Sequence, residues 1–464
     1  MLRSGKYSSF FAKLEIIVAV VLFFVMLVSC GLYINIKMNG KSANLPPLSD
    51  ADKRMLLRSA GSESVVFDDD LIEPVFMGVR RQGESFAAFP NDKERRLFEE
   101  SVYEAVNGLF AGQSSEMSFN SHEERLSFLD EIKNSEDYIL VSFYSDLPAE
   151  LFLPCMANNY NPVNNTLDFD VKNLFMLPDA DGNTYGISVS TDCSVTVMVP
   201  YLKLSFNKIS EEAYDVVKDS SLFEFNDSMP ILPVLTSSFY APKYSVFPSV
   251  YLYGKSIDSR FVQDLLAVFS INKNMVKSFS SGDNTETNYV EESRELVIND
   301  SGLVLFKSDD NGGIPIDEFL GYYSGNGGNY SFADKIFALK SLVNKLNVNA
   351  DFSFSVSGLN YNIRKSSLRV YFKYSIDGCL MTDNAYDAVF EISGNLLTYA
   401  EFFMYECGKS EEMNIVYPQN YAAAVLDDGS DEDYVICPVL SGKSLNNVKS
   451  PVWTKISFSE KDGE

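Results

Sequence analysis

The sequence contains very little histidine: His122 is the single example in 464 residues. A Ser-His-Asp or Cys-His nucleophile system would have to use this residue, which stands in a polar segment typical of a protein surface. Zinc sites built from several histidines are excluded, and the cysteines lack the short spacings that would replace them. The sequence therefore predicts no catalytic residue, no metal ligand and no cofactor.

Cysteine is also scarce. Five cysteines lie in the body of the chain, an odd number, at Cys155, Cys193, Cys379, Cys407 and Cys437. In an oxidising compartment the pairs Cys155–Cys193 or Cys379–Cys407 are conceivable, and buried free thiols are an equal alternative.

Basic residues are few relative to acidic ones. The chain has 38 Lys and Arg against 64 Asp and Glu, a formal net charge of −26. Phosphate backbones and anionic lipid surfaces would repel so acidic a body, which argues against nucleic acid as a partner. The ordinary interpretation of the acidic surface is that it keeps the protein soluble.

Near matches to motifs lack their remaining parts. Asp179 to Asn183 resembles a calcium loop, but its glycine is misplaced and Ser190 stands where a bidentate Glu is needed, so we expect a turn. Ser205 to Lys208 fits S-x-x-K, but no K-[ST]-G accompanies it, and we expect it to follow a strand without opening a helix. Paired carboxylates abound, and a hydrolase that uses such a pair is a third hypothesis, which the sequence does not support.

One long apolar run stands out near the N-terminus. Between Glu15 and Lys37 lie 21 uncharged residues, which as a helix span about 31 Å, the thickness of a hydrocarbon core. Arg3, Lys6 and Lys13 precede the run, and this bias favours a cytoplasmic N-terminus with the remainder outside.

Two alternatives to an uncut span stay open. A cleaved signal peptide would need a small-residue A-x-A site, which this run lacks. The segment from Leu27 to Cys30 resembles a bacterial lipobox, in which Cys30 would carry a lipid, although the residues after it stay apolar. With either an uncut span or a lipid on Cys30, the body is tethered outside the cytoplasm.

Hydrophobic periodicity in the body predicts both helices and strands. We expect amphipathic helices over 92–111, from the capping residues Asn120 and Ser121 to Lys133, over 257–269, and from Ser331 onward. Buried or alternating strands are expected at 138–144, within 173–206 with a turn at Asp181-Gly182, and at 296–298, 303–306, 352–356, 368–374, 388–392 and 396–399. ELVINDSGLVLF and VFEISGNLLTYA are locally alike and indicate a weak internal repeat of a helix followed by a meander.

These patterns predict an α+β protein, with a single N-terminal transmembrane helix and a multi-domain extracytoplasmic region in which helices pack on antiparallel sheets. The expected divisions are a cytoplasmic tail 1–15, a transmembrane helix 16–36, a linker 37–65, an N-terminal α+β domain 66–255, a central helix-plus-sheet module 256–330 and a C-terminal helix-plus-sheet module 331–464.

The order of these features resembles the YycH/YycI family, accessory regulators of the WalK–WalR cell-wall two-component system. The residues that carry the likeness are the N-terminal tail with its one span, YILVSFYSDLP, NYVEESRELVINDSGLVLF, YFKYSIDGCLMTDNAYDAVFEISGNLLTY, and the late SPVWTKISF with Trp453. The likeness covers most of the chain in layout. The cysteines and the long Gly/Asn loops have no counterpart that we can assign in the family.

The resemblance implies a membrane-anchored regulator without catalytic residues, which binds a sensor histidine kinase and a sister accessory membrane protein and tunes the kinase. Small residues let helices approach closely in lipid, so Ser29, Cys30 and Gly31 are the candidate contact between spans, against the simpler interpretation that they face lipid. The alternative function is a cell-surface lipoprotein or wall-associated ligand-binding protein.

Overall fold

A computed structural model describes most of the body of the chain. The described residues are 72–89, 92–149, 151–152, 169–226, 231–309, 312–320, 330, 332–346, 352–362, 367–426, 434–441 and 448–457. The chain divides into two units, residues 1–63 and 64–464, and all described residues belong to the second. The predicted span, with Ser29, Cys30 and Gly31, lies outside them. No helix in the described part combines the length and the apolar character needed to cross a membrane.

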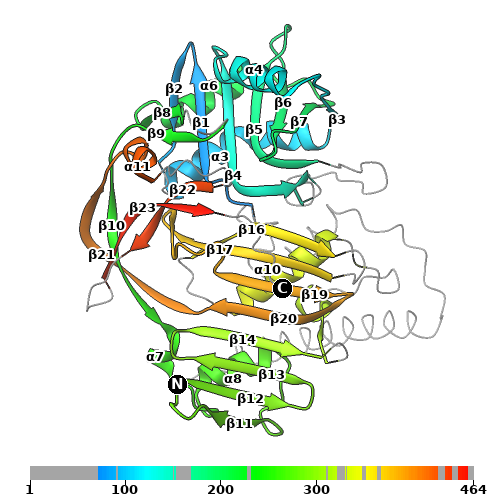
Figure 1. Cartoon of the computed structure of the whole chain (residues 1–464), viewed down its shortest axis with the longest axis vertical. Coiled ribbons are helices and arrows are strands. Elements are labelled where there is room, and N and C mark those ends of the chain that lie inside the picture. The colour runs from blue at the N-terminus through cyan, green and yellow to red at the C-terminus, as the bar shows by residue number, and fades with distance from the viewer. Residues whose placement is uncertain are drawn as a thin grey trace, which may run out of the picture. The chain divides into compact units, whose positions relative to one another are not determined.

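The first half of the body forms a nine-stranded sheet (Figure 1). Neighbouring strands pair antiparallel. In spatial order they are β3 (Gln113–Glu116), β7 (Val195–Val199), β6 (Thr184–Val189), β5 (Asp170–Pro178), β4 (Tyr138–Pro148), β1 (Phe76–Arg81), β2 (Glu84–Ala87), β8 (Ser221–Phe225) and β9 (Pro233–Leu235).

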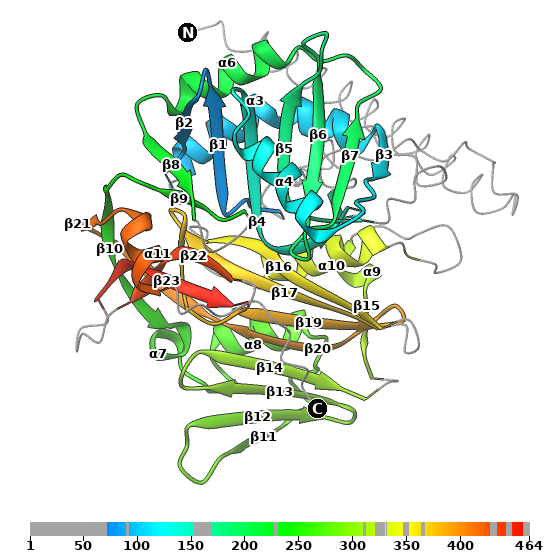
Figure 2. The same ribbon diagram turned by 45° about the horizontal axis from the view of Figure 1, so that its top comes forward.

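Helices cover both faces of this sheet, as Figure 2 shows. Helices α3 (Asp92–Phe110) and α6 (Phe206–Val217) pack on the face that carries Ile139 and Val141 of β4. Helix α4 (His122–Lys133) packs on the opposite face with Tyr138 and Leu140. Because both faces are buried, β4 reads as a continuous apolar run without alternation, which confirms the buried strand expected at 138–144.

The second half contributes most of a fourteen-stranded sheet. Its main path runs through β11 (Lys277–Ser280), β12 (Glu286–Glu291), β13 (Arg294–Asn299), β14 (Leu303–Ser308), β20 (Leu396–Phe403), β19 (Ala388–Ser393), β17 (Ser367–Ile376), β18 (Cys379–Leu380), β22 (Tyr434–Ser441), β23 (Val448–Ser457), β10 (Phe239–Pro248) and β21 (Tyr405–Val416). Two strands lie off this path: β15 (Ile314–Pro315) pairs with β20, and β16 (Ser353–Asn362) pairs with β17.

The internal repeat seen in the sequence has a structural counterpart. Helix α8 (Arg260–Val268) precedes β11 to β14, and helix α10 (Phe332–Lys345) precedes β16, β17, β19 and β20. The last strands of the two sets, β14 and β20, pair antiparallel with Phe306 opposite Ala400, so both sets share one sheet. Phe269, directly after α8, stacks on Phe306 with ring centroids 4.7 Å apart. Full burial of such a ring contributes about 2–3 kcal/mol.

Local signals in the sequence set the ends of these elements. Ser121 caps α4 by accepting a hydrogen bond from the Glu124 N–H at 3.1 Å, as predicted. The turns of the two repeated hairpins place Gly302 and Gly394 at φ +88° and +60°, a region that glycine enters without strain. Short helices complete the fold: α7 (Ser249–Tyr253), α9 (Asp317–Leu320) and α11 (Gln419–Leu426).

A buried polar contact joins the two sheets. Glu73, at the start of the described chain, forms an ion pair with Arg95 of α3, and both side chains are at most 8% exposed. The Ser375 hydroxyl, on β17 of the large sheet, donates to Glu73 at 3.1 Å. Ser145 Oγ of β4 also donates to the Ser357 carbonyl of β16, at 2.5 Å. These bonds fix the relative orientation of the two sheets.

The described cysteines do not form the disulfide pairs considered above. Cys193, Cys379, Cys407 and Cys437 are thiols that form no disulfide, and Cys155 lies outside the described residues. Neither Cys155–Cys193 nor Cys379–Cys407 is therefore a disulfide. Cys193, Cys379 and Cys437 are buried and Cys407 is half-buried, which agrees with the alternative of free thiols.

Candidate protein-binding surface

Strands β10 and β21 form a long antiparallel ribbon along one side of the body (Figure 1). Tyr240 lies opposite Ile415, and Pro242 lies opposite Met413. One face of the ribbon, with Phe239, Ala241 and Val416, packs into the core. Side chains alternate between the two faces of a strand, so Tyr240, Met413 and Ile415 stand on the other face, toward solvent.

This outer face is apolar, although it is open to water. Tyr240 is 69% exposed, Met413 55%, Ile415 49%, and Tyr417, just after β21, 72%. Helix α11 follows directly along the chain and exposes Tyr421 and Val425 as well, at i and i+4 on one side of the helix. We refer to Tyr240, Met413, Ile415 and Tyr417 as the ribbon patch. Clustered exposed apolar side chains mark a surface that binds another molecule.

The edge of the large sheet at β21 is long. No strand in the described part pairs with the side of β21 that faces away from β10. The other terminal strands, β3, β9 and β11, have four residues or fewer, against twelve in β21. The remaining long edge, on β16, is covered by β4. An open strand edge presents unpaired N–H and C=O groups to a partner.

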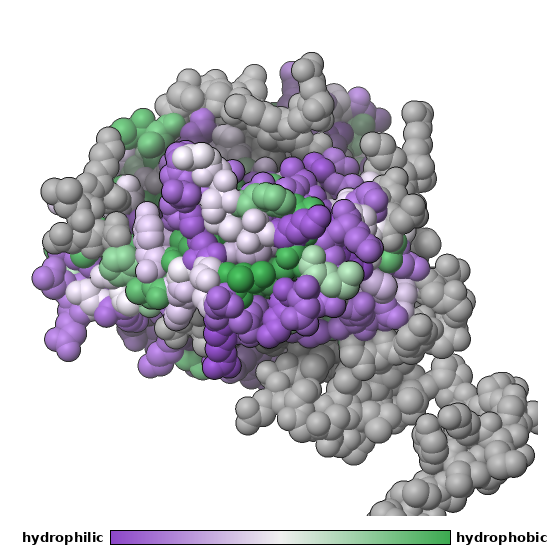
Figure 3. All heavy atoms as spheres, turned by 90° about the horizontal axis from the view of Figure 1, so that it is seen from below, coloured by the Kyte–Doolittle hydropathy of each residue, from purple (hydrophilic) through white to green (hydrophobic). Residues whose placement is uncertain are grey.

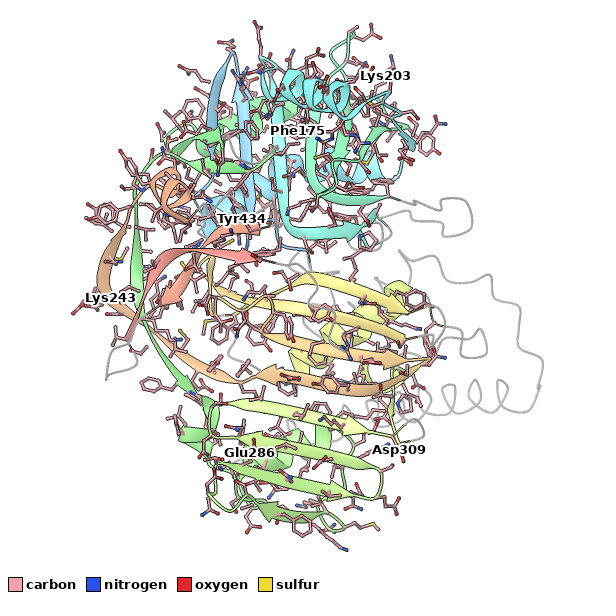
Figure 4. The ribbon with its side chains drawn as sticks, in the orientation of Figure 1. Phe175, Lys203, Lys243, Glu286, Asp309 and Tyr434 are labelled. Carbon is pink, nitrogen blue, oxygen red and sulfur yellow. The ribbon has the colours of Figure 1, made fainter. Side chains whose placement is uncertain are left out.

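Charged residues surround the ribbon patch and are mostly paired. Lys243 of β10, labelled in Figure 4, reaches Glu412 at 2.8 Å. Lys409 reaches Asp377 at 2.5 Å, and the Tyr244 hydroxyl donates to the same carboxylate at 2.6 Å. Burial and this hydrogen bond raise the pKa of Tyr244, so its hydroxyl stays protonated. The pairs hold the ribbon in place beneath its apolar face.

A second exposed apolar group belongs to α7 and β11. Tyr251, Leu252, Tyr253 and Phe279 are each more than half exposed. Figure 3 views the molecule from the end that carries β11 and shows apolar residues as patches among hydrophilic ones. Strand β11 is short and carries Lys277 at its start, a feature that discourages added strands. The ribbon patch is therefore the stronger candidate for binding a protein chain.

A polar cleft of about 330 Å3 opens beside the end of α4. Lys133 pairs with Asp130 at 2.6 Å, and Arg80 donates to the Lys133 carbonyl at 2.8 Å. The buried Tyr138 hydroxyl lies near Arg80 and Ser85 but makes no hydrogen bond of good geometry with the described residues. Burial raises the pKa of Tyr138, and nearby Arg80 partly offsets this. The remaining members of the lining are Ser85, Asn134, Phe223, Glu224 and Phe225.

The structure locates most of the sequence motifs considered above. His122 is exposed at the start of α4. Asp179 accepts the N–H groups of Asp181 and Asn183, which makes the predicted turn. Ser205 directly precedes α6, so S-x-x-K does open a helix, contrary to expectation. Lys208 is nevertheless 72% exposed and lies 3.9 Å from Glu212. No group of metal ligands gathers anywhere in the described ranges.

The ribbon patch escaped the sequence analysis. In the sequence, the patch is marked only by two apolar residues at alternate positions, Met413 and Ile415, near the end of β21. That pattern does not reveal which of the two faces is covered. The predicted contact residues Ser29, Cys30 and Gly31 lie outside the described residues, so that prediction stays untested.

The architecture defines a class: a mixed α+β body with two antiparallel sheets, helices packed on them, and an exposed apolar ribbon at one edge. No protein-family model matches the chain, and no curated protein matches it. Among solved structures, the chain resembles YycH from Bacillus subtilis, with a TM-score of 0.55, 11% identity, and coverage of 84% of this chain and 97% of that one. The protein has a YycH-like fold, which confirms the resemblance drawn from the sequence at the level of the fold.

Proposed function

We propose that the protein is a non-enzymatic, membrane-anchored regulator that binds a sensor histidine kinase and tunes its signalling. The observation that carries the proposal is the YycH-like fold over 84% of the chain. The exposed ribbon patch supports it independently, because a body that works by docking needs an accessible apolar surface.

The proposed topology follows from the N-terminal sequence. Residues 1–15 lie in the cytoplasm, 16–36 span the membrane, and 37–65 link the span to the body outside. The 21 uncharged residues and the basic residues before them support this orientation. The body comprises a domain at 66–255 and helix-plus-sheet modules at 256–330 and 331–464.

Two contacts would hold the kinase. In the membrane, the small side chains of Ser29, Cys30 and Gly31 would allow a partner helix to approach closely. Outside it, the ribbon patch would dock a partner domain, and a sister accessory membrane protein could share this surface. A regulator of this kind shifts the kinase between states by binding one of them more tightly.

Co-purification from membranes tests the proposal. The full chain, tagged at its C-terminus, is expressed in its host, and each sensor histidine kinase is sought in the detergent-solubilised eluate. We expect one kinase to be enriched and its autophosphorylation to change when the full chain is deleted. A matched chain whose 16–36 segment is replaced by an unrelated apolar span should retain less kinase.

Three results would contradict the proposal. One is the absence of enrichment for every kinase; another is unchanged kinase signalling in the deletion strain. The third is protection of the native body from protease added to intact spheroplasts, under conditions that cleave a known outer-surface control protein. Equal retention by the span-replaced chain would remove the contact at Ser29, Cys30 and Gly31 but leave the regulator proposal intact.

A further inference from the structure

The backbone of β21 points its hydrogen-bonding groups in a direction that its pairing reveals. Met413 lies opposite Pro242, which has no N–H to donate. In an antiparallel pair, residues that do not bond each other turn their N–H and C=O groups away from the partner strand. Met413 therefore presents both groups to the open edge, and so does Ile415, two residues further on. The neighbour Asn414 bonds inward, to Ala241.

The side chains at the same positions stand on the exposed face. Met413 and Ile415 are about half exposed, and Tyr240 beside Ile415 is more so. A strand added along this edge would place alternate side chains on that face, next to Met413 and Ile415. Backbone bonds and apolar contacts would thus form together over the same residues.

A β-bulge interrupts the pairing of β21 with β10 between Lys409 and Met413, so the regular edge beside the ribbon patch runs from Met413 to Val416. Strand β21 contains no proline, and its lysine, Lys409, is tied to Asp377. Natural edges are commonly blocked by a free lysine, a proline or a short length. The segment from Met413 to Val416 contains neither a lysine nor a proline, so it is suited to receive a short added strand.

Charge indicates what kind of strand would bind. Strand β21 carries Glu406 and Glu411 besides Glu412, which pairs with Lys243, and the whole chain has a net charge of −26. A second copy of this chain would bring an equal negative charge, so self-pairing is disfavoured. A basic segment with alternating apolar residues would complement the acidic groups along the edge and the ribbon patch beside them.

We propose that β21 is completed by strand addition: an extended segment of another protein, with alternating basic and apolar residues, pairs with the backbone of Met413 and Ile415. This is the recognition mode in which main-chain bonds provide affinity and alternate side chains provide specificity. The inference rests on the proposed function in one respect, since it names how the body of the regulator holds its partner.

The test uses the full chain in detergent and two synthetic peptides. The probe has four lysine–valine repeats, and the control has four glutamate–valine repeats. Binding is followed by fluorescence anisotropy, and backbone amide exchange is measured at Met413 and Ile415. We expect the basic peptide to bind and to slow exchange at both amides about tenfold or more, and the acidic peptide to do neither.

Proline substitutions distinguish backbone N–H groups that would bind a peptide from those that the fold requires. Ile415→Pro removes an N–H that β10 does not use, so the protein should fold while peptide binding weakens about tenfold or more. Ile415→Ala keeps the N–H and should weaken binding less. Asn414→Pro removes an N–H that bonds to β10, so it should lower the urea midpoint of unfolding. A loss of binding in Ile415→Pro and a loss of stability in Asn414→Pro would together confirm that the Ile415 N–H faces the open edge and the Asn414 N–H faces β10.

The outcomes distinguish this inference from the proposed function. Equal binding of both peptides, unchanged exchange at Met413 and Ile415, or equal binding by Ile415→Pro and wild type would each overturn strand addition. If Ile415→Pro still co-purifies the kinase as wild type does, the regulator survives and the edge is not its contact. If no kinase co-purifies but the basic peptide protects β21, the edge inference survives and the kinase proposal falls.

Discussion

Lys373 and Asp387 form an ion pair inside the large sheet, with Nζ 3.0 Å from Oδ2 and both side chains fully buried. Each charge has further partners. The Lys373 ammonium donates to the carbonyl groups of Thr382 and Asn384 at 3.1 and 2.9 Å, and Asp387 accepts from the Tyr374 N–H at 2.9 Å. These additional hydrogen bonds allow the buried ion pair to persist, because they replace the hydrogen bonds to water that each charged group loses on burial.

Removing one member of this pair should destabilise the fold strongly. Lys373→Met leaves Asp387 buried without its counter-charge, at a cost of about 3–5 kcal/mol in the free energy of unfolding. Urea denaturation followed by circular dichroism measures the change. The double variant Lys373→Met with Asp387→Leu should be less destabilised than Lys373→Met alone, since no buried charge remains. Equal loss in both variants would show that packing dominates at this site.

Lys172 should make stability rise with pH. Burial lowers the pKa of this β5 side chain from its ordinary value of 10.5 to about 8, with nearby Asp146 partly opposing the shift. Between these values the unfolded chain binds more protons than the folded chain, so the unfolding free energy increases with pH across this window. The full gain is about 3 kcal/mol, and at pH 7 none of it is present.

The test compares the unfolding free energies of wild type and Lys172→Met at pH 7.5 and 9.5. Other groups titrate in both proteins, so the difference in unfolding free energy between wild type and variant isolates this lysine. Lys172→Met should be more stable than wild type at the lower pH, and its advantage should shrink at the higher pH. An advantage that does not change with pH would contradict the lowered pKa.

The thiol of Cys437 should be chemically inert in the folded protein. Burial on β22 raises its pKa to about 12, although Lys373 and Arg95 act in the opposite direction. Thiolate is the reactive form, so at pH 8 an alkylating reagent should modify Cys437 only when the protein unfolds. Mass spectrometry of peptides labelled with and without urea makes the measurement. Rapid labelling of Cys437 without denaturant would disprove its burial.

Two buried tyrosines should respond in opposite ways to loss of the hydroxyl. Tyr244→Phe removes the bond to the Asp377 carboxylate at 2.6 Å and should cost about 1.5–3 kcal/mol. Tyr138→Phe removes a buried hydroxyl that makes no hydrogen bond of good geometry in the described part of the chain, so stability should stay unchanged or rise by up to about 1 kcal/mol. Thermal unfolding of both variants ranks them. A large loss for Tyr138→Phe would mean that its hydroxyl is bonded in solution.

Local sequence patterns predicted many of the elements. The stripe of α3, with Phe98, Val102 and Leu109, is buried as its 3.6-residue period required. The predicted turn at Asp181-Gly182 is present, with Gly182 at φ +80°. These features follow from the chain's own neighbours: helix period, strand alternation and turn chemistry each act over a few residues.

The alternation of side chains along β17 does not reveal that Lys373 is buried. In β17, alternation places Lys373 on the same face of the strand as Arg369 and Tyr371, yet Lys373 is fully buried. Arg369, on the same strand, is exposed and pairs with Glu391 at 2.7 Å. The period of a strand defines its two faces but does not show what covers each face. The partner Asp387 comes from the segment between β18 and β19.

The sequence by itself determined the α+β class, the turns and the net acidic charge, because composition and short-range periodicity are sufficient for these. Tertiary structure alone decided that the two repeats share one sheet through β14 and β20. It also decided that, within the described part of the chain, β21 ends the sheet as an open edge beside Tyr240. The physical reason is that strand pairing joins residues far apart in the chain, and no local pattern records which strand has a neighbour on each side.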